Sequence, residues 1–287
     1  MGYGPSTMKL HTIDTGFFKL DGGAMFGVVP KSIWNRTNPA DENNLCTWAL
    51  RCLLIEDGNR LILVDTGVGN KQDEKFFSHY YLHGDATLDS SLAAKGFSRD
   101  DITDVFLTHL HFDHAGGAVV REGEKLVPAF KNATYWSNRQ HWDWAINPNE
   151  REKASFLKEN ILPIQESGRL KFIPVEDGFQ FTENIRVRFV YGHTDAMMLP
   201  LISYKNKQVL YAADLVPSTG HIPLAYVMGY DMFPLKTLQE KKIILNEAVE
   251  NQYILYFEHD PVNECCTLQQ TEKGARLKDV FRLDELG

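Results

Sequence analysis

A short run of metal-ligand side chains is the feature that most constrains this chain. Three histidines and one aspartate lie within six positions, in the pattern H-x-H-x-D-H from His109 to His114. The apolar run 105–107 precedes them and predicts a short buried strand, and Gly116 and Gly117 follow, where the backbone can turn tightly. Imidazole and carboxylate suit zinc and related divalent ions, and a bound cation stabilises neutral imidazole beside ionised carboxylate. The stretch therefore predicts a metal site at a strand end.

Three further strand ends carry the same types of side chain. His193 follows the apolar strand predicted over 185–191, Asp214 follows the one over 208–212, and His259 follows the one over 253–257. Strand ends at one edge of a layered α/β sheet converge in space, so we expect these groups to meet the motif. Five histidines and two carboxylates exceed the needs of one tetrahedral zinc and suit two bridged metals. The expected metal ligands are His109, His111, Asp113, His114, His193, Asp214 and His259.

Asp65 ends another strand, predicted over 60–64, in the sequence Asp-Thr-Gly. Its carboxylate could orient a metal-bound histidine from behind. It could equally cap the turn that Gly67 permits. The sequence leaves both interpretations open.

Composition excludes several classes of partner. The net charge is −8 and no block of lysine and arginine stands out, which disfavours binding to nucleic acid or to an anionic membrane. No apolar run reaches about 18 residues, so no membrane span is expected, and no secretory signal is found. Residues 1–7 are interpreted as a leader or remnant outside the fold. The cysteines have no C-x-x-C spacing, which predicts buried reduced thiols and a cytoplasmic protein; they are Cys46, Cys52, Cys265 and Cys266.

Two successive strand-rich halves, each with helices, predict one layered α/β domain over 8–287. A hairpin is expected within 17–29, turning at Asp21, and another around 205–207. Helices are expected over 88–95, after Ser137, over 150–160 as far as Pro163, and over 235–249. The segment with Trp142 has the character of a lid or interface, and its His141 is not expected to be a ligand. On the last helix four charged residues are expected to face solvent: Glu240, Lys241, Lys242 and Glu247.

The irregular stretch from Met25 to Trp34 is rich in apolar groups. It could line a pocket for an acyl or aromatic group, or it could form a subunit contact or a satellite core. Aromatic residues between 71 and 82 also suggest a contact surface, and a homodimer is expected.

The ordered set H-x-H-x-D-H, Gly192-His193, Ala213-Asp214 and Glu258-His259-Asp260 resembles the metallo-β-lactamase superfamily. The resemblance covers nearly the whole chain. It implies an αβ/βα sandwich, with two facing β-sheets and helices outside, and two Zn²⁺ ions per chain, with Mn, Fe or Co as alternatives. By this resemblance His109, His111 and His193 bind one metal. Asp113, His114 and His259 bind the other, Asp214 bridges them, and Asp65 stands behind the ligands.

Within that superfamily the chain is most similar to N-acyl-homoserine lactone lactonases, the quorum-quenching branch related to methyl parathion hydrolase. The similarity lies in the stretch 25–30, the segment 142–163 and the His193-Thr194 turn. It implies a metal-dependent hydrolase that opens the lactone ring with a hydroxide bridging two metals about 3.5–4 Å apart. Asp113 is expected to carry a proton to the leaving group. No G-x-S-x-G nucleophile motif is found.

The chain departs from this branch at Pro217, where many of these lactonases have a tyrosine that binds the lactone carbonyl. His221 is expected to supply the missing donor, with Ser218 or Thr219 as alternatives and with Tyr226 and Tyr230 as weaker candidates. The expected substrate-binding residues are Met25, Phe26, Val28, Trp34 and Tyr226.

Other functions remain as alternatives. One is an organophosphate or aryl-ester hydrolase of the methyl-parathion-hydrolase type, and another is a thioester hydrolase resembling glyoxalase II. The mixed charges after residue 271 do not form the basic cluster that a glutathione thioester would favour. A non-enzymatic zinc protein would need protein ligands at every coordination position, which nothing in the sequence indicates.

Overall fold

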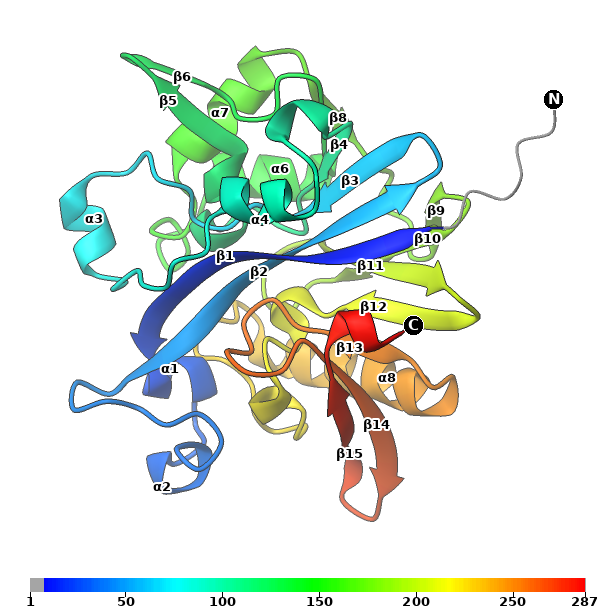
Figure 1. The fold of residues 1–287 in the computed structure, drawn as a ribbon. Coiled ribbons are helices and arrows are strands. Elements are labelled where there is room, and N and C mark those ends of the chain that lie inside the picture. Colours follow the sequence, from blue (N-terminus) through cyan, green and yellow to red (C-terminus); the bar gives the residue numbers. More distant parts are fainter. Residues whose placement is uncertain (1–7, 287) are drawn as a thin grey trace, which may run out of the picture. The chain divides into compact units, whose positions relative to one another are not determined.

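The computed structural model describes residues 8–286, so the leader predicted over 1–7 lies outside the described residues. Helices and strands are mixed along the chain, as predicted (Figure 1). The contacts divide the described chain into two compact units. Unit 1 comprises 8–15, 51–72 and 85–175, and unit 2 comprises 16–50, 73–84 and 176–286. Two of the boundaries between the units fall inside strands β1 and β2, and each unit is described by itself below.

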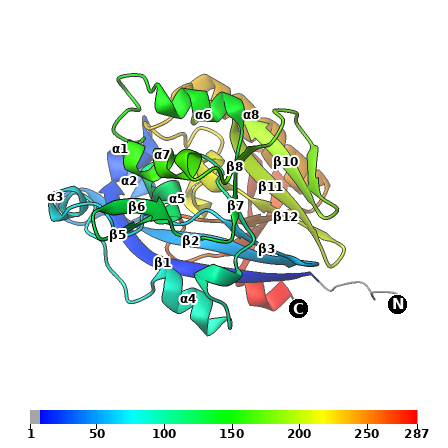
Figure 2. The same cartoon turned by 90° about the horizontal axis from the view of Figure 1, so that it is seen from above.

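Unit 1 is built on a sheet of order β1-β2-β3-β4-β7-β8. Its strands are β1 (Lys9–Asp21), β2 (Leu45–Asp57), β3 (Arg60–Val64), β4 (Asp104–Phe106), β7 (Thr134–Ser137) and β8 (Leu170–Phe172). Strands β3, β4, β7 and β8 pair in parallel, and their apolar residues pack with those of the helices into a buried core. The helices are α4 (Leu88–Ala94), η1 (Arg99–Asp101), α5 (Phe112–Ala115), η2 (Gly116–Ala118), α6 (Arg139–Ile146) and α7 (Lys158–Glu166). Strands β5 (Val119–Glu122) and β6 (Lys125–Pro128) form a small antiparallel sheet (Figure 2).

Unit 2 contains a sheet of order β15-β14-β13-β12-β11-β10-β9. Its strands are β9 (Phe179–Thr182), β10 (Ile185–Val190), β11 (Met197–Tyr204), β12 (Lys207–Tyr211), β13 (Ile254–Tyr256), β14 (Cys265–Thr271) and β15 (Gly274–Phe281). The pair β12–β13 is parallel and the others are antiparallel. Helix α8 (Pro234–Glu250) packs against β14 and β15 (Figure 1). The remaining helices are α1 (Gly22–Phe26), α2 (Lys31–Trp34), α3 (Glu74–Ser78), η3 (Ala213–Leu215), η4 (Thr219–His221) and η5 (Leu283–Leu286).

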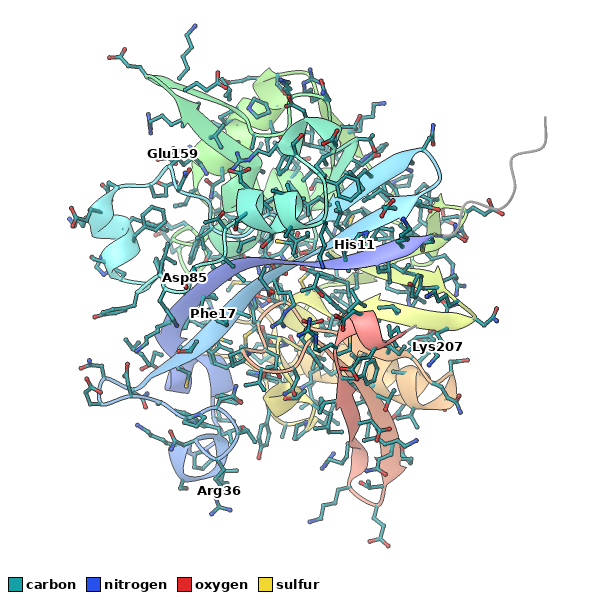
Figure 3. The ribbon with its side chains drawn as sticks, viewed as in Figure 1. His11, Phe17, Arg36, Asp85, Glu159 and Lys207 are labelled. Carbon is teal, nitrogen blue, oxygen red and sulfur yellow. The ribbon has the colours of Figure 1, made fainter. Side chains whose placement is uncertain are left out.

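Several local predictions are confirmed. Helix α4 lies within the predicted range and ends before Gly96, whose φ of +85° favours glycine. The hairpin of β11 and β12 turns at Lys205 and Asn206, both with positive φ, and the side chain of Lys207 points away from the sheet (Figure 3). The strands before His193, Asp214 and His259 are all present.

The hairpin predicted at Asp21 is wrong. Strand β1 continues to Asp21, whose side chain accepts a hydrogen bond from the Ala24 amide at 2.8 Å and so caps α1. A side chain at Gly22 would lie 2.2 Å from the Trp34 ring, so this glycine permits close packing instead of a turn. An aspartate before two glycines is compatible with a hairpin turn and with a helix start. Here the close packing of Trp34 on Gly22 accompanies the helix.

Other boundaries also differ from the predictions. Residues 150–157 form turns, and α7 begins only at Lys158 and includes Pro163. Asn138, not Ser137, caps α6, and Trp142 on that helix is buried in the unit 1 core, so it is no lid residue. Residues 274–281 of the charged tail form strand β15.

Helix α8 matches its prediction in extent but not in orientation. Lys242 is exposed, whereas Glu240 and Lys241 are buried, the lysine completely. Both charged side chains instead bind backbone groups of neighbouring segments.

All four cysteines are buried free thiols, as predicted. Among the described residues, none of the helices has the length and apolar character needed to cross a membrane.

Candidate metal centre

The H-x-H-x-D-H motif lies in unit 1, where strand β4 leads through a short loop into α5. Its four ligand-type side chains are all buried. The ring centroid of His109 lies 4.5 Å from that of His111 and 3.9 Å from that of His114. Asp113 lies beside His114, with an oxygen 3.6 Å from Nε2. The four groups predicted from the motif are therefore brought together within this unit.

Asp65, at the end of β3, lies directly behind this motif. Its carboxylate accepts hydrogen bonds from the Thr108 amide at 2.8 Å and the Thr108 hydroxyl at 2.7 Å, and it lies 3.1 Å from Nδ1 of His114. The residue has a positive φ of 58°, a conformation that costs energy for a non-glycine residue and persists where surrounding contacts impose it. Of the two interpretations left open for Asp65, these contacts fit the carboxylate behind a histidine.

A second carboxylate, Glu152, was not found by sequence reasoning. It is buried, and its oxygens lie 2.9 Å from Nε2 of His111 and 2.7 Å from the Trp144 indole nitrogen. His141 also supports the motif, because its Nε2 accepts a hydrogen bond from the Leu110 amide at 2.9 Å. Glu152 is 41 positions from His111 and lies among turns, so no local spacing pattern links the two.

The glycines after the motif allow two backbone segments to lie close together, and they do not form the tight turn expected from the sequence. Gly116 has an ordinary helical φ of −60°. A Cβ atom on Gly116 would lie 2.1 Å from the Val68 carbonyl oxygen, and one on Gly117 would lie 2.1 Å from that of Thr66. The backbone after β3 thus packs directly on the motif.

Unit 2 contains the other three predicted ligands. An oxygen of Asp214 lies 3.1 Å from Nε2 of His193, and its other oxygen lies 3.2 Å from Nε2 of His259. The carboxylate thus stands between the two imidazoles. Ala213 before it has a φ of 41°, which is a strained backbone conformation for a non-glycine residue next to a functional group.

A further carboxylate missed by the sequence analysis orients His193. Asp231 is buried, and its oxygen lies 2.8 Å from Nδ1 of His193. Burial alone would disfavour a charged ring, but Asp214 and Asp231 outweigh it and raise the pKa of His193 to about 10. The surroundings of His193 therefore stabilise positive charge, which a divalent cation also supplies.

The backbone before His193 is held by α8. Glu240 accepts hydrogen bonds from the Tyr191 and Gly192 amides, both at 2.9 Å. A Cβ atom on Gly192 would lie 2.3 Å from the Thr237 backbone nitrogen, so the strand end can approach the helix only with glycine there.

The orientation of the histidines tests whether this donor set fits a metal. Each ring has one nitrogen within hydrogen-bond distance of a protein oxygen that is not itself one of the expected ligands. That nitrogen is Nε2 in His111, beside Glu152, and Nδ1 in the other four rings. The partners of those four are the Thr108 hydroxyl for His109, Asp65 for His114, Asp231 for His193 and the Ala49 carbonyl for His259. Metal-binding histidines are commonly oriented in this way, and the arrangement assigns the opposite nitrogen of each ring to the metal. The donor set fits a divalent metal site.

The residues predicted to bind substrate lie in unit 2, mostly in its interior. Phe26 is buried and stacks on Trp34 with ring centroids 5.3 Å apart and on His221 with centroids 4.3 Å apart. Met25 is also buried, whereas Val28 is 94% exposed. Met25, Phe26 and Trp34 therefore form a satellite core, which was one of the alternatives for this stretch.

Both ring nitrogens of His221, the predicted carbonyl donor, contact protein oxygens. Its Nδ1 lies 2.8 Å from the Ser218 hydroxyl, and its Nε2 lies 2.8 Å from the Met25 carbonyl oxygen. Complete burial lowers the pKa of His221 to about 3, which keeps the ring neutral. Through these two contacts His221 joins α1 to η4.

The other candidate donors differ in their surroundings. Thr219 donates its hydroxyl hydrogen to Asp260 at 2.7 Å, and Ser218 is buried against His221. Tyr226 is partly exposed and meets the Phe26 ring edge-on. Tyr230 is 37% exposed. Of these residues, Tyr226 best combines an accessible side chain with a fixed aromatic neighbour.

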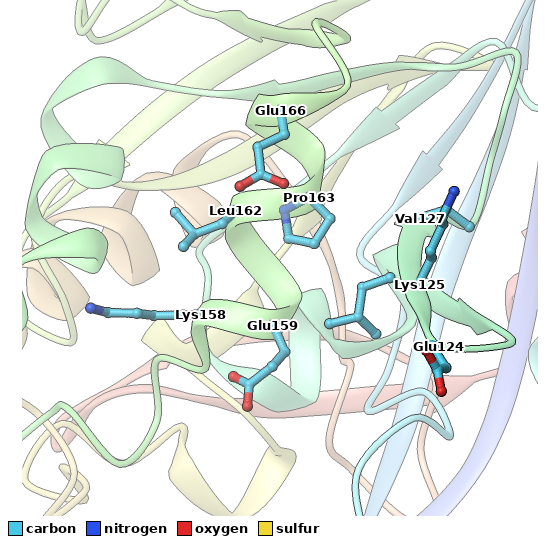
Figure 4. A pocket seen from close by; sticks show the side chains of 9 residues that line it. Glu124, Lys125, Val127, Lys158, Glu159, Leu162, Pro163 and Glu166 are labelled. Atoms are coloured by element: carbon cyan, nitrogen blue, oxygen red, sulfur yellow. The ribbon is translucent and has the colours of Figure 1, made fainter.

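A groove of about 480 Å³ lies in unit 1 between β6 and α7 (Figure 4). The residues that line it include the charged Glu124, Lys125, Lys158 and Glu159 and the apolar Leu162. None of the predicted ligands lines it. The groove is therefore separate from the candidate metal centre.

Comparisons with known proteins agree with this geometry. The model of the metallo-beta-lactamase superfamily matches residues 51–246. An N-acyl homoserine lactonase of Bacillus thuringiensis is 25% identical over 267 residues, which cover 88% of this chain and 93% of that protein.

Solved structures share the fold. A probable metal-dependent hydrolase from Staphylococcus aureus superposes with a TM-score of 0.87 at 27% identity, covering 97% of this chain and 98% of that one. AidC, a dizinc quorum-quenching lactonase in complex with a product, gives a TM-score of 0.78 at 21% identity, covering 98% and 97%. The fold class predicted from the sequence is confirmed. Because the family model matches more than half of its length, this chain belongs to the metallo-beta-lactamase superfamily and is a hydrolase.

Proposed function

We propose that the chain is a dinuclear-metal lactonase that opens the ring of N-acyl-homoserine lactones. The observation that carries the proposal is the oriented donor set, in which every ligand histidine has one nitrogen held by the protein. In this proposal the unit 1 and unit 2 residues share two metal ions. The ligands are those expected from the sequence, with Asp214 as the bridging carboxylate.

The metals, when bound, supply a Lewis acid for the lactone carbonyl and lower the pKa of a water molecule towards about 7. The residues of the chain hold and orient these groups. Asp113, buried beside His114, moves a proton towards the leaving oxygen of the ring. Asp65, Glu152 and Asp231 keep three of the ligand rings in fixed tautomers and orientations.

The lactone assignment is supported by the named relatives, which are N-acyl homoserine lactonases. Tyr226 takes the place of the carbonyl-binding tyrosine that Pro217 replaces, because its side chain is partly exposed and is held edge-on against the Phe26 ring. The apolar residues near Phe26 support the loop that carries it.

The test is an assay on zinc-loaded, metal-quantified protein. A long-chain acyl-homoserine lactone is supplied and ring opening is followed by proton release, with an aryl phosphotriester in parallel. We expect a kcat/KM for the lactone well above that for the phosphotriester. Absence of lactone turnover in the zinc-loaded protein contradicts the proposal, and a preference for the phosphotriester supports the organophosphate hydrolase instead.

Variants of one ligand from each unit test whether both sets belong to one centre. His109→Ala and His259→Ala are each expected to lower bound zinc and to reduce kcat by at least about 10³, since a metal-generated nucleophile is lost. His79→Ala is the matched control, because His79 is an exposed histidine outside the donor set. Full turnover in either ligand variant would show that the site is misassigned.

A further inference from the structure

Lys241 is a buried cation whose role the site description does not explain. It lies on α8 and is fully buried. Burying an ammonium group is costly unless its charge and hydrogen bonds are satisfied. Its neighbour Lys242 is exposed and has no such constraint. A lysine in the interior therefore needs a reason in the local structure.

The partners of Lys241 are backbone oxygens of one segment. Its Nζ donates to the carbonyls of His221 at 2.6 Å and Tyr226 at 2.9 Å, and more weakly to those of Pro223 at 3.2 Å and Leu224 at 3.4 Å. Four carbonyls pointing at one ammonium fix the path of residues 221–226. Burial lowers the pKa of Lys241 to about 7, and the Asp231 carboxylate acts in the opposite direction.

This segment is the middle of the 215–233 connection, which we define as the residues from the end of η3 to the start of α8. The connection begins one residue after the ligand Asp214. Near its first third, Thr219 donates from its amide and its hydroxyl to Asp260, the neighbour of the ligand His259. At its far end, Asp231 holds His193. The connection thus touches all three unit 2 ligands or their immediate neighbours.

The far end of the connection is tied to the His193 backbone as well. The Met232 amide donates to the His193 carbonyl at 3.1 Å, and the Phe233 amide donates to that of Gly192 at 2.8 Å. Apart from the short η4, the connection has no regular secondary structure of its own between its two ends. Its middle therefore depends on outside contacts, which include those of Lys241 and the bond from the Gly229 amide to the Ala24 carbonyl.

We propose that Lys241 is a positioning residue for the metal centre. By holding residues 221–226, it keeps the 215–233 connection in the path that places Asp231 on His193. The inference rests on the proposed role of His193 as a metal ligand. Lys241 touches neither substrate nor metal, and it acts through Asp231.

The experiment measures zinc binding without substrate, by competition with a chelator, on folded protein. Lys241→Met removes the ammonium and keeps most of the length of the side chain, and Lys242→Met makes the same change on the exposed face of the same helix. We expect Lys241→Met to weaken zinc binding about 10-fold, at the lower end of the effects seen for residues behind metal ligands. It should also speed hydrogen exchange at the Gly229 and Met232 amides. Zinc affinity equal to that of Lys242→Met would overturn the proposal.

A double-mutant cycle with Asp231→Asn tests whether Lys241 affects zinc binding through Asp231. If Lys241 acts through Asp231, the combined variant loses less zinc affinity than the product of the two single losses. Independent effects would contradict the route, whatever the change in overall stability. Should the methionine variant not fold, Lys241→Gln keeps two donors at this position and is expected to weaken zinc binding at least about threefold. Because no lactone is present, failure of the lactonase assay leaves this result unaffected.

Discussion

At the scale of single residues, the carboxylates behind the histidines define this centre. Asp65, Glu152 and Asp231 are all buried, and each contacts the ring nitrogen opposite the proposed ligand nitrogen. A carboxylate there makes the ligand nitrogen a stronger donor and prevents the ring from turning. The precision of the centre therefore depends on these side chains as well as on the ligands.

Glu152 gives the clearest test of this role. Glu152→Gln preserves the size of the side chain but removes the charge beside Nε2 of His111. We expect zinc affinity to fall about 10- to 100-fold while the protein remains folded, because the orientation and basicity of His111 change and the size of the side chain does not. Chelator competition measures the change. Glu159→Gln, at an exposed position of α7, is the control and should bind zinc as the wild type does.

The same residues show where sequence reasoning ends. The residues from His109 to His114 form a local pattern that predicts metal binding without a structure. The remaining proposed ligands each follow an apolar strand, which the sequence also shows. Glu152 and Asp231 lie in irregular segments 41 and 38 positions from their histidines. Only tertiary contacts distinguish them from the many acidic residues that face solvent.

At the scale of elements, the charged face of α8 illustrates how tertiary contacts override a pattern. Helical spacing and composition predicted the extent of α8 well. They also predicted that Glu240 and Lys241 face solvent, because charged residues seldom lie in an interior. Both are buried because they bind backbone groups of segments that have no regular partners of their own. A periodicity argument cannot detect such distant backbone partners.

The strands of unit 1 offer a prediction about pH. Asp104 on β4 binds Arg60 on β3 through two hydrogen bonds of 2.6 and 3.0 Å, and it accepts one from the Trp136 indole on β7 at 2.7 Å. Burial alone would raise the pKa of Asp104, but hydrogen bonds from Arg60, Thr103 and Trp136 outweigh it and hold that pKa below its usual value. The ionised carboxylate thus ties three neighbouring strands together.

Asp104→Asn is therefore expected to lower the free energy of unfolding at pH 7 by about 2 kcal/mol. A carboxyl group with a depressed pKa contributes its stability above its unfolded value of about 3.9, and loses that contribution as pH falls through its folded value. The difference from wild type should therefore shrink between pH 5 and pH 3, as measured by urea unfolding at each pH. Asp100→Asn, at an exposed ion pair, is the control and should change stability by less than about 0.5 kcal/mol. A difference that stays constant down to pH 3 would refute the assignment.

At the scale of the whole molecule, the proposed ligands divide between the two units. Unit 1 contains the motif, and unit 2 contains His193, Asp214 and His259. The sequence predicted one domain over 8–287, and the proposed function assigns the ligands of both units to the same two metal ions. Shared binding has a thermodynamic consequence, because metal that binds only the native protein stabilises it by an amount that grows with the logarithm of its concentration.

Removal of the metal tests this directly. Zinc at about 100 times its dissociation constant should stabilise the protein by about 2.7 kcal/mol, and a chelator should reverse the accompanying rise in Tm. If both units hold the same ions, His114→Ala in unit 1 and Asp214→Asn in unit 2 each remove most of the zinc-dependent rise, since either change disrupts the shared centre. If each unit binds metal independently, each variant retains the part of the zinc-dependent rise in Tm that metal bound to the other unit contributes. Calorimetry at increasing zinc concentration separates the two cases, with His79→Ala as the variant that should keep the full rise.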